Sequence, residues 1–99
     1  RRPVPDVNVE MTQAINGWVA EVTVTAGDSR TKHRVTLSQP IYLALTRGRS
    51  SPEHLIRESF AFLLELETNE SILREFDLTR ISDFFPTFER DIKERLGSQ

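Results

Sequence analysis

Alternating apolar and polar residues on both sides of an Asn-Gly pair restrict the fold of this chain more than any other feature. Residues 7–12 alternate with the period of a half-buried strand. Asn16-Gly17 follows, and a type I′ turn favours this pair because both of its central residues need a positive φ. A turn at these two residues aligns Ile15 with Trp18, Met11 with Val22 and Val9 with Val24. All six side chains then share one face, so the sequence predicts a hairpin with one buried face.

A third strand is predicted after a second turn within residues 27–30. Residues 31–38 alternate again. Their inner set is Thr31, His33, Val35 and Leu37. Three antiparallel strands over residues 7–38 that bury only one face need a cover from elsewhere in the chain.

The clearest helix signal begins at Ser51. Ser51 suits the N-cap, Pro52 suits the first helical position, and Glu53 favours the positive end of the helix dipole. A broad apolar stripe follows at helical spacing, and we expect this helix to end near Glu67.

Shorter helical segments are expected on both sides of this long helix. Residues 39–46 open with Pro40 and could form two helical turns or a fourth strand, of which the helix is favoured. The later segments are a short helix capped by Thr68 or Asn69 that contains Ile72, Leu73 and Phe76, a stretch over 78–85, and a last helix from Pro86 to Leu96.

These elements predict an α+β fold, in which a three-stranded antiparallel β-meander packs against a long amphipathic helix and a C-terminal helical segment. We expect residues 1–6 to form a flexible arm and residues 7–97 to form a single domain. Within that domain, residues 7–38 make the meander, 39–50 a connector and 51–97 the helical part.

The composition fits a soluble, folded domain. Hydrophobic residues make up 37% of the sequence and aromatic residues 8%, which is enough to offset chain entropy and argues against disorder. No apolar stretch approaches the roughly 20 residues of a membrane-spanning helix. The chain has no cysteine, which excludes disulfides and thiol chemistry and fits the cytoplasm. The first residues do not resemble a signal peptide, although the absence of an initial Met leaves removal of an upstream segment open.

No catalytic, cofactor or metal site is predicted. His54 and Glu58 have the i,i+4 spacing of two metal ligands, but a zinc site needs three or four, and only His33 could supply a third. The chain contains neither a nucleophile elbow nor a phosphate-binding glycine loop. We therefore expect a non-enzymatic protein.

Positive charge is concentrated in the first half of the chain. Residues 1–50 carry seven basic and four acidic residues, whereas residues 51–99 carry six basic and eleven acidic residues. The candidate contacts for an acidic partner or nucleic acid are Arg30, Lys32, Arg34, Arg47 and Arg49. The sheet lacks outward aromatic residues for base stacking, and charge on an edge strand can also serve only to prevent aggregation. Both interpretations stay open.

An aromatic run near the C-terminus suggests an interface. The candidate interface residues are Phe84, Phe85, Phe88 and Ile92. One sheet can leave part of such a seam uncovered, which would favour a homodimer or a protein partner. The alternative is that these aromatic residues form a purely intramolecular core, and both interpretations stay open. The leading hypothesis is therefore a protein-interaction or self-association module. The alternatives are a nucleic-acid-binding or regulatory domain that uses the basic residues, and a small-molecule pocket near His33 and Trp18.

The order of several motifs resembles a family of short bacterial proteins. The motifs that carry this resemblance are the hairpin, residues 51–60 (SPEHLIRESF), residues 70–73 (ESIL), residues 76–78 (FDL) and residues 84–86 (FFP). The similarity covers residues 7 to 96, and the family has no assigned activity. It implies a compact bacterial domain and transfers no functional residue.

Overall fold

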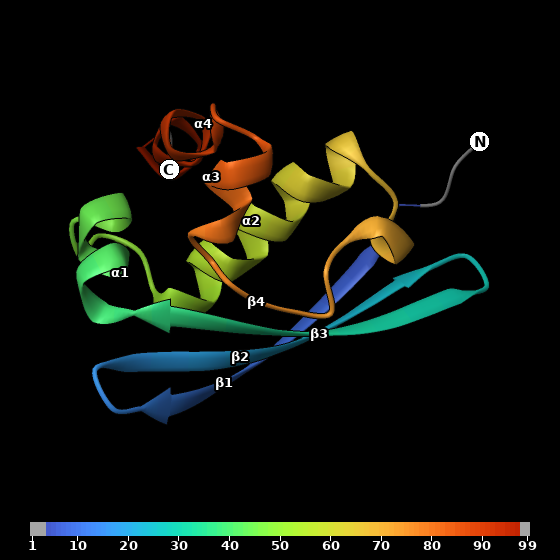
Figure 1. Ribbon diagram of the computed structural model, residues 1–99, viewed down its shortest axis with the longest axis horizontal. Coiled ribbons are helices and arrows are strands. Elements are labelled where there is room, and N and C mark those ends of the chain that lie inside the picture. Colours follow the sequence, from blue (N-terminus) through green and yellow to red (C-terminus); the bar gives the residue numbers. More distant parts are fainter. Residues whose placement is uncertain (1–3, 98–99) are drawn as a thin grey trace.

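A four-stranded sheet with helices on one face forms the molecule (Figure 1). The structure is a computed structural model, and it describes residues 4–97. In chain order its elements are β1 (Asp6–Ala14), β2 (Gly17–Ala26), β3 (Ser29–Ser38), α1 (Gln39–Thr46), α2 (Pro52–Leu66), the 3₁₀ turn η1 (Asn69–Ser71), β4 (Glu75–Asp77), α3 (Arg80–Phe84) and α4 (Phe88–Gly97). The predicted α+β class is confirmed.

The strands lie in the order β1-β2-β3-β4. β1, β2 and β3 are antiparallel neighbours, as the predicted meander requires. The short β4 then pairs with β3 in parallel, with Val35 opposite Phe76. No fourth strand was predicted here. β3 is thus an interior strand over Arg34–Thr36, and the interpretation of its charges as edge protection is wrong for that stretch.

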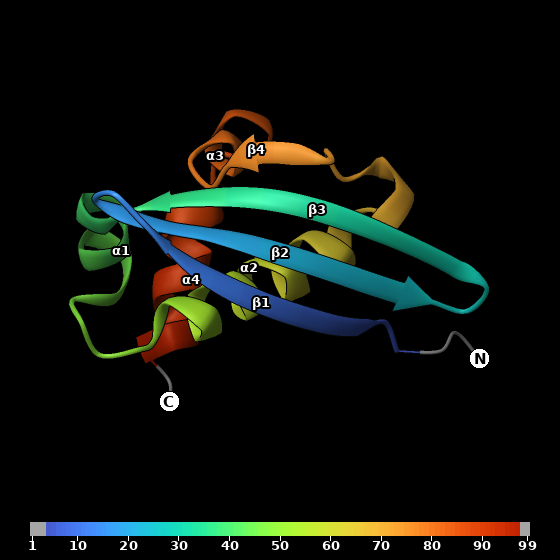
Figure 2. The ribbon, with the colours of Figure 1, turned by 90° about the horizontal axis from the view of Figure 1, so that it is seen from below.

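All the helices cover the same face of the sheet, and the other face is open (Figures 1 and 2). The core lies between the two layers, where Val22, Val24 and Leu37 from the sheet meet Leu55 and Phe60 of α2. The predicted inner set of β3 is buried. Within residues 4–97, no helix has the length and apolar character needed to cross a membrane.

The β1–β2 hairpin has a different turn from the predicted one. Ala14 pairs with Gly17 and Val9 pairs with Val22, so Ile15 and Asn16 form the loop. Asn16 has a φ of 63°, and the side chain of Ile15 is 94% exposed instead of buried. The predicted register is therefore wrong by two residues, whereas the faces are right because a shift of two preserves the alternation.

The reason for the shift lies in how closely β3 approaches Gly17. Gly17 is opposite Ser38, and a Cβ atom at Gly17 would lie 2.2 Å from the Leu37 carbonyl oxygen. Glycine is needed at this position for close contact between two strands. A turn signal read from two residues cannot detect that contact, because Leu37 is twenty residues further along the chain.

Serine N-caps begin both helices on either side of the 47–50 loop. Ser38 Oγ accepts a hydrogen bond from Ile41 N at 3.4 Å, which confirms residues 39–46 as a helix. Ser51 Oγ accepts one from His54 N at 3.0 Å, as predicted for α2. The Tyr42 hydroxyl donates to the Ser50 carbonyl and so ties the end of the loop to α1.

The later part of the chain is less helical than predicted. Of the predicted short helix only Asn69–Ser71 form a helical turn, and a non-helical stretch over 72–74 leads into β4. Phe85 ends α3 with φ −131° and ψ 89°, because a residue before proline disfavours the helical conformation. α4 then begins at Phe88, two residues after the predicted start at Pro86. Of the predicted N-terminal arm, residues 1–3 lie outside the described part and Asp6 already belongs to β1.

Gly17→Ala should destabilise the fold. The added methyl group would collide with the Leu37 carbonyl, and the strands would have to separate. We expect urea denaturation to show a free energy of unfolding lower by about 1–3 kcal/mol. Gly97→Ala is the matched control, because nothing lies within 4 Å of its added Cβ. Equal stability of Gly17→Ala and the natural sequence would contradict the contact.

Candidate functional site

A groove of about 270 Å³ lies between the end of α2, η1, β4 and α3. Its floor is apolar and consists of Leu63, Ile72, Phe76 and Ile81, all of which are buried. We call it the Phe84 groove. A concave apolar surface with few polar groups is typical of binding sites.

Two large apolar side chains stand exposed on its rim. Phe84 is 56% exposed and Leu73 is 44% exposed. Phe85, which also lines the groove, is half-buried against Phe62 with ring centroids 6.0 Å apart. The site therefore combines a hollow with projecting apolar side chains on a single patch.

Two opposite charges also line the groove. Glu67 follows the last residue of α2, and burial raises the pKa of its carboxyl. Arg80 lies on α3, where Nη1 is 3.4 Å from Asp83 Oδ2 and the guanidinium carbon is 5.5 Å from the Phe84 ring centroid. Within residues 4–97, Glu67 has no basic side chain at ion-pair distance.

A buried hydrogen-bond chain positions the η1–β4 wall of the groove. Asn69 Nδ2 donates to Thr31 Oγ1 at 3.1 Å, and Thr31 Oγ1 lies 2.8 Å from His33 Nε2. His33 Nδ1 lies 2.8 Å from the Leu73 carbonyl. A carbonyl can only accept, so Nδ1 carries the proton and Nε2 accepts from Thr31. These hydrogen bonds fix Leu73, and with it this side of the groove's rim, to β3.

His33 is held in its neutral form. Its side chain is 1% exposed, and burial lowers its pKa. The hydrogen bond to Leu73 acts against this lowering, and the nearby positive charge of Arg74 adds to it. A neutral imidazole satisfies both of its partners, whereas a proton on Nε2 would oppose the donor from Thr31.

Asp77 fixes the other end of β4. Its carboxylate accepts hydrogen bonds from Thr36 Oγ1 at 2.6 Å and from the Thr79 backbone and hydroxyl at 3.1 and 2.7 Å. Burial alone would raise the pKa of Asp77, but these hydrogen bonds outweigh it and leave the pKa below its usual value. The strand and the start of α3 are thus joined at one side chain.

The structure places only part of the predicted interface at the surface. Phe84 is exposed and Phe85 is half-buried. Phe88 and Ile92 lie in the core, where Phe88 packs against Phe62 with ring centroids 5.4 Å apart. Phe88 and Ile92 were predicted as candidate interface residues, but they are buried because α4 turns them towards α2.

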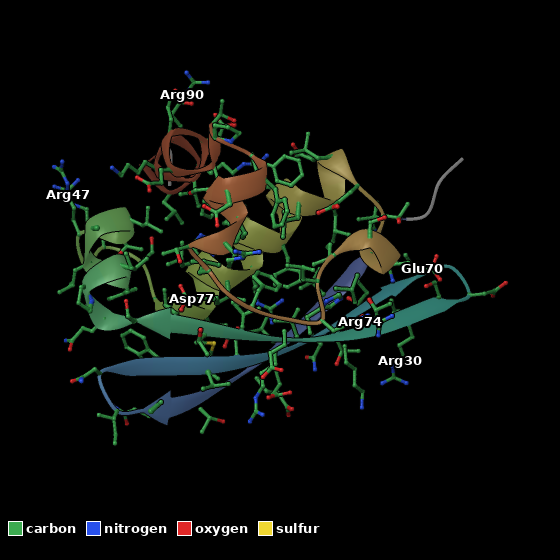
Figure 3. The ribbon with its side chains drawn as sticks, viewed as in Figure 1. Arg30, Arg47, Glu70, Arg74, Asp77 and Arg90 are labelled. Carbon is green, nitrogen blue, oxygen red and sulfur yellow. The ribbon has the colours of Figure 1, made fainter. Side chains whose placement is uncertain are left out.

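The five basic residues do not converge. Figure 3 shows Arg30 projecting from the open face of the sheet and Arg47 beyond α1 at the opposite end of the molecule. Arg34 pairs with Glu21 at 3.0 Å and lies opposite Glu75 in the sheet. The candidate basic residues of the open face are thus interrupted by carboxylates.

A separate hollow of about 200 Å³ between α1 and α4 is lined by Arg47, Arg49 and Lys93. This arrangement gives less support to a nucleic-acid surface than the sequence suggested.

Sequence reasoning missed Glu67, Leu73 and Arg80 as site residues. The alternation of Phe76 and Leu78 with Glu75, Asp77 and Thr79 is the signal that could have revealed β4 and the extended wall. The alternative pocket near His33 and Trp18 finds no support among the described residues. Neither residue lines the Phe84 groove, the hollow between α1 and α4, or a third hollow of about 770 Å³ between the end of α2 and the β2–β3 turn.

Comparison with known proteins gives no relatives. No known family matches the chain, and neither a curated protein nor a solved structure gives a significant match. The resemblance to short bacterial proteins therefore stays a prediction.

Because His33 is buried in its neutral form, we expect the free energy of unfolding to depend on pH. The unfolded state has the ordinary His pKa of 6.5 and the folded state a lower one, so the unfolded state binds the proton more readily. The stabilising contribution of neutral His33 is thus present above pH 6.5 and is lost as the pH falls below it. Asp77, with its lowered pKa, adds a further loss only below its ordinary value of 3.8.

Urea denaturation at about pH 7.5 and about pH 5.5 measures this effect. His33→Asn should lower the free energy of unfolding at the higher pH by about 1–3 kcal/mol, because buried partners lose their hydrogen bonds. It should also remove most of the decline between the two pH values. His54→Asn is the matched control and should retain the decline. A decline that persists unchanged without His33 would refute the assignment.

Proposed function

We propose that this chain is a non-enzymatic protein-interaction module that associates with a second copy of itself through the Phe84 groove. The carrying observation is that a projecting Phe84, 56% exposed, borders an apolar hollow of about 270 Å³. An isologous dimer uses the same patch on both copies, so a patch with both a projection and a hollow can complement itself.

Burial of apolar surface supplies the driving force. Phe84 and Leu73 remain in contact with water in the single chain, although the neighbouring floor of the groove is apolar. Insertion of each Phe84 into the groove of the other copy would remove four large side chains from water. The contact is small beside a standard interface, so we expect a dissociation constant on the order of 10 µM.

The chemistry of the lining supports binding over catalysis. Ser71 provides the only hydroxyl among the residues that line the groove, and it bonds to Thr68 Oγ1 at 3.2 Å. No histidine lines the groove, and the hydrogen-bond partner of the Ser71 hydroxyl is another hydroxyl and not a base. A cytoplasmic location stays part of the proposal and is supported by a sequence without cysteine.

Sedimentation velocity over a range of about 1–500 µM tests the proposal. The natural sequence should shift from monomer towards dimer within this range. Phe84→Asp should stay monomeric, because a charge would be buried in an apolar groove.

Ile15→Asp is the matched control. Ile15 is even more exposed than Phe84 but lies in the β1–β2 loop, away from the groove, so its variant should associate like the natural sequence. A monomer at every concentration, or equal loss of association in both variants, would overturn the proposal.

A further inference from the structure

The Phe84 groove contains a carboxylate whose surroundings disfavour its charge. Glu67 is at the C-terminal end of α2, where the helix dipole is negative, and the last turn of α2 has no basic residue. Burial also raises the pKa of Glu67. A cation from outside the chain would therefore be more stabilising here than at an ordinary surface carboxylate.

The groove also carries a cation that is free to change its partner. Arg80 pairs with Asp83 one turn away at 3.4 Å, and the side chains are 54% and 61% exposed. An ion pair this exposed contributes little, so exchange of Asp83 for another carboxylate costs little. The Arg80 guanidinium lies over the ring of Phe84.

From these two observations we propose that Arg80 of one copy pairs with Glu67 of the second copy. This inference rests on the proposed self-association, and it adds an ion pair between the two copies. Phe84 inserted into the groove of the second copy brings the guanidinium that lies over its ring into the same groove. Glu67 lines that groove. The two-fold symmetry of an isologous contact makes the pair twice, once on each side of the axis.

The pair also selects for a second copy over an arbitrary apolar partner. An apolar residue alone would fill the groove but leave Glu67 partly buried without a cation. The patch offers the residues that the groove needs, namely one exposed phenyl ring and one exposed positive charge beside it. Electrostatic complementarity of this kind supplies specificity and register.

A charge exchange tests the pair by sedimentation velocity. Glu67→Arg and Arg80→Glu should each weaken dimerisation roughly tenfold, because like charges would meet across the interface. The double variant restores opposite charges and should return to within about threefold of the natural affinity. Glu67→Gln, a milder change, should also weaken the dimer and make its affinity less dependent on salt.

Lys93→Glu is the matched control. It makes the same change of charge as Arg80→Glu at an exposed position of α4 that does not line the groove, and it should leave the affinity unchanged. Circular dichroism should confirm that each variant is folded.

The outcomes separate the two proposals. One outcome is that Phe84→Asp abolishes the dimer, whereas Glu67→Gln and the two charge reversals leave it intact. In that case the proposed ion pair between Arg80 and Glu67 is wrong and the proposed self-association stands. The proposed ion pair is also wrong if both single charge reversals weaken dimerisation and the double variant does not restore the affinity. A natural sequence that never dimerises overturns both proposals.

Discussion

The hydrogen bond between His33 and the Leu73 carbonyl joins the two halves of the molecule, and the groove depends on it. His33 belongs to the meander, and Leu73 belongs to the segment that connects η1 to β4. Asn69 strengthens the junction through its hydrogen bonds to Thr31 and Ser29. β4 has only three residues and pairs along its backbone with β3, so this junction at its start and the Asp77 hydrogen bonds at its end both help to fix it. The polar groups here are satisfied by one another, which makes the junction both costly to break and specific in geometry.

Only the tertiary structure decides which charged side chains lie next to each other. By sequence the first half is basic and the second half acidic, which suggests two oppositely charged surfaces. In the sheet, however, Arg34 lies between Glu21 of β2 and Glu75 of β4. The two halves are thus interleaved on the open face. The acidic character persists at the end of α2, where Glu67 lines an apolar groove.

The predictions succeed where the signal is local. Strand alternation identified the buried face of β3, and the Ser-Pro-Glu start identified α2, because side-chain periodicity and capping depend on neighbours in the chain. The hairpin turn was misplaced because Gly17 serves a contact with β3 and not the positive φ of a turn. Phe88 and Ile92 were correctly predicted to be apolar positions of a helix, but which partner covers them depends on how α4 packs.

By itself the sequence determined the α+β class, the three antiparallel strands, the long helix and the apolar faces that must meet. These properties follow from periodicity, caps and turn residues, which act over a few positions. The tertiary structure alone decided the hairpin register, the parallel fourth strand and the groove in which Phe84, Arg80 and Glu67 meet. Each of these arises from a contact between residues that are distant in the chain, such as Gly17 with Leu37 or His33 with Leu73, and no local pattern encodes such a contact.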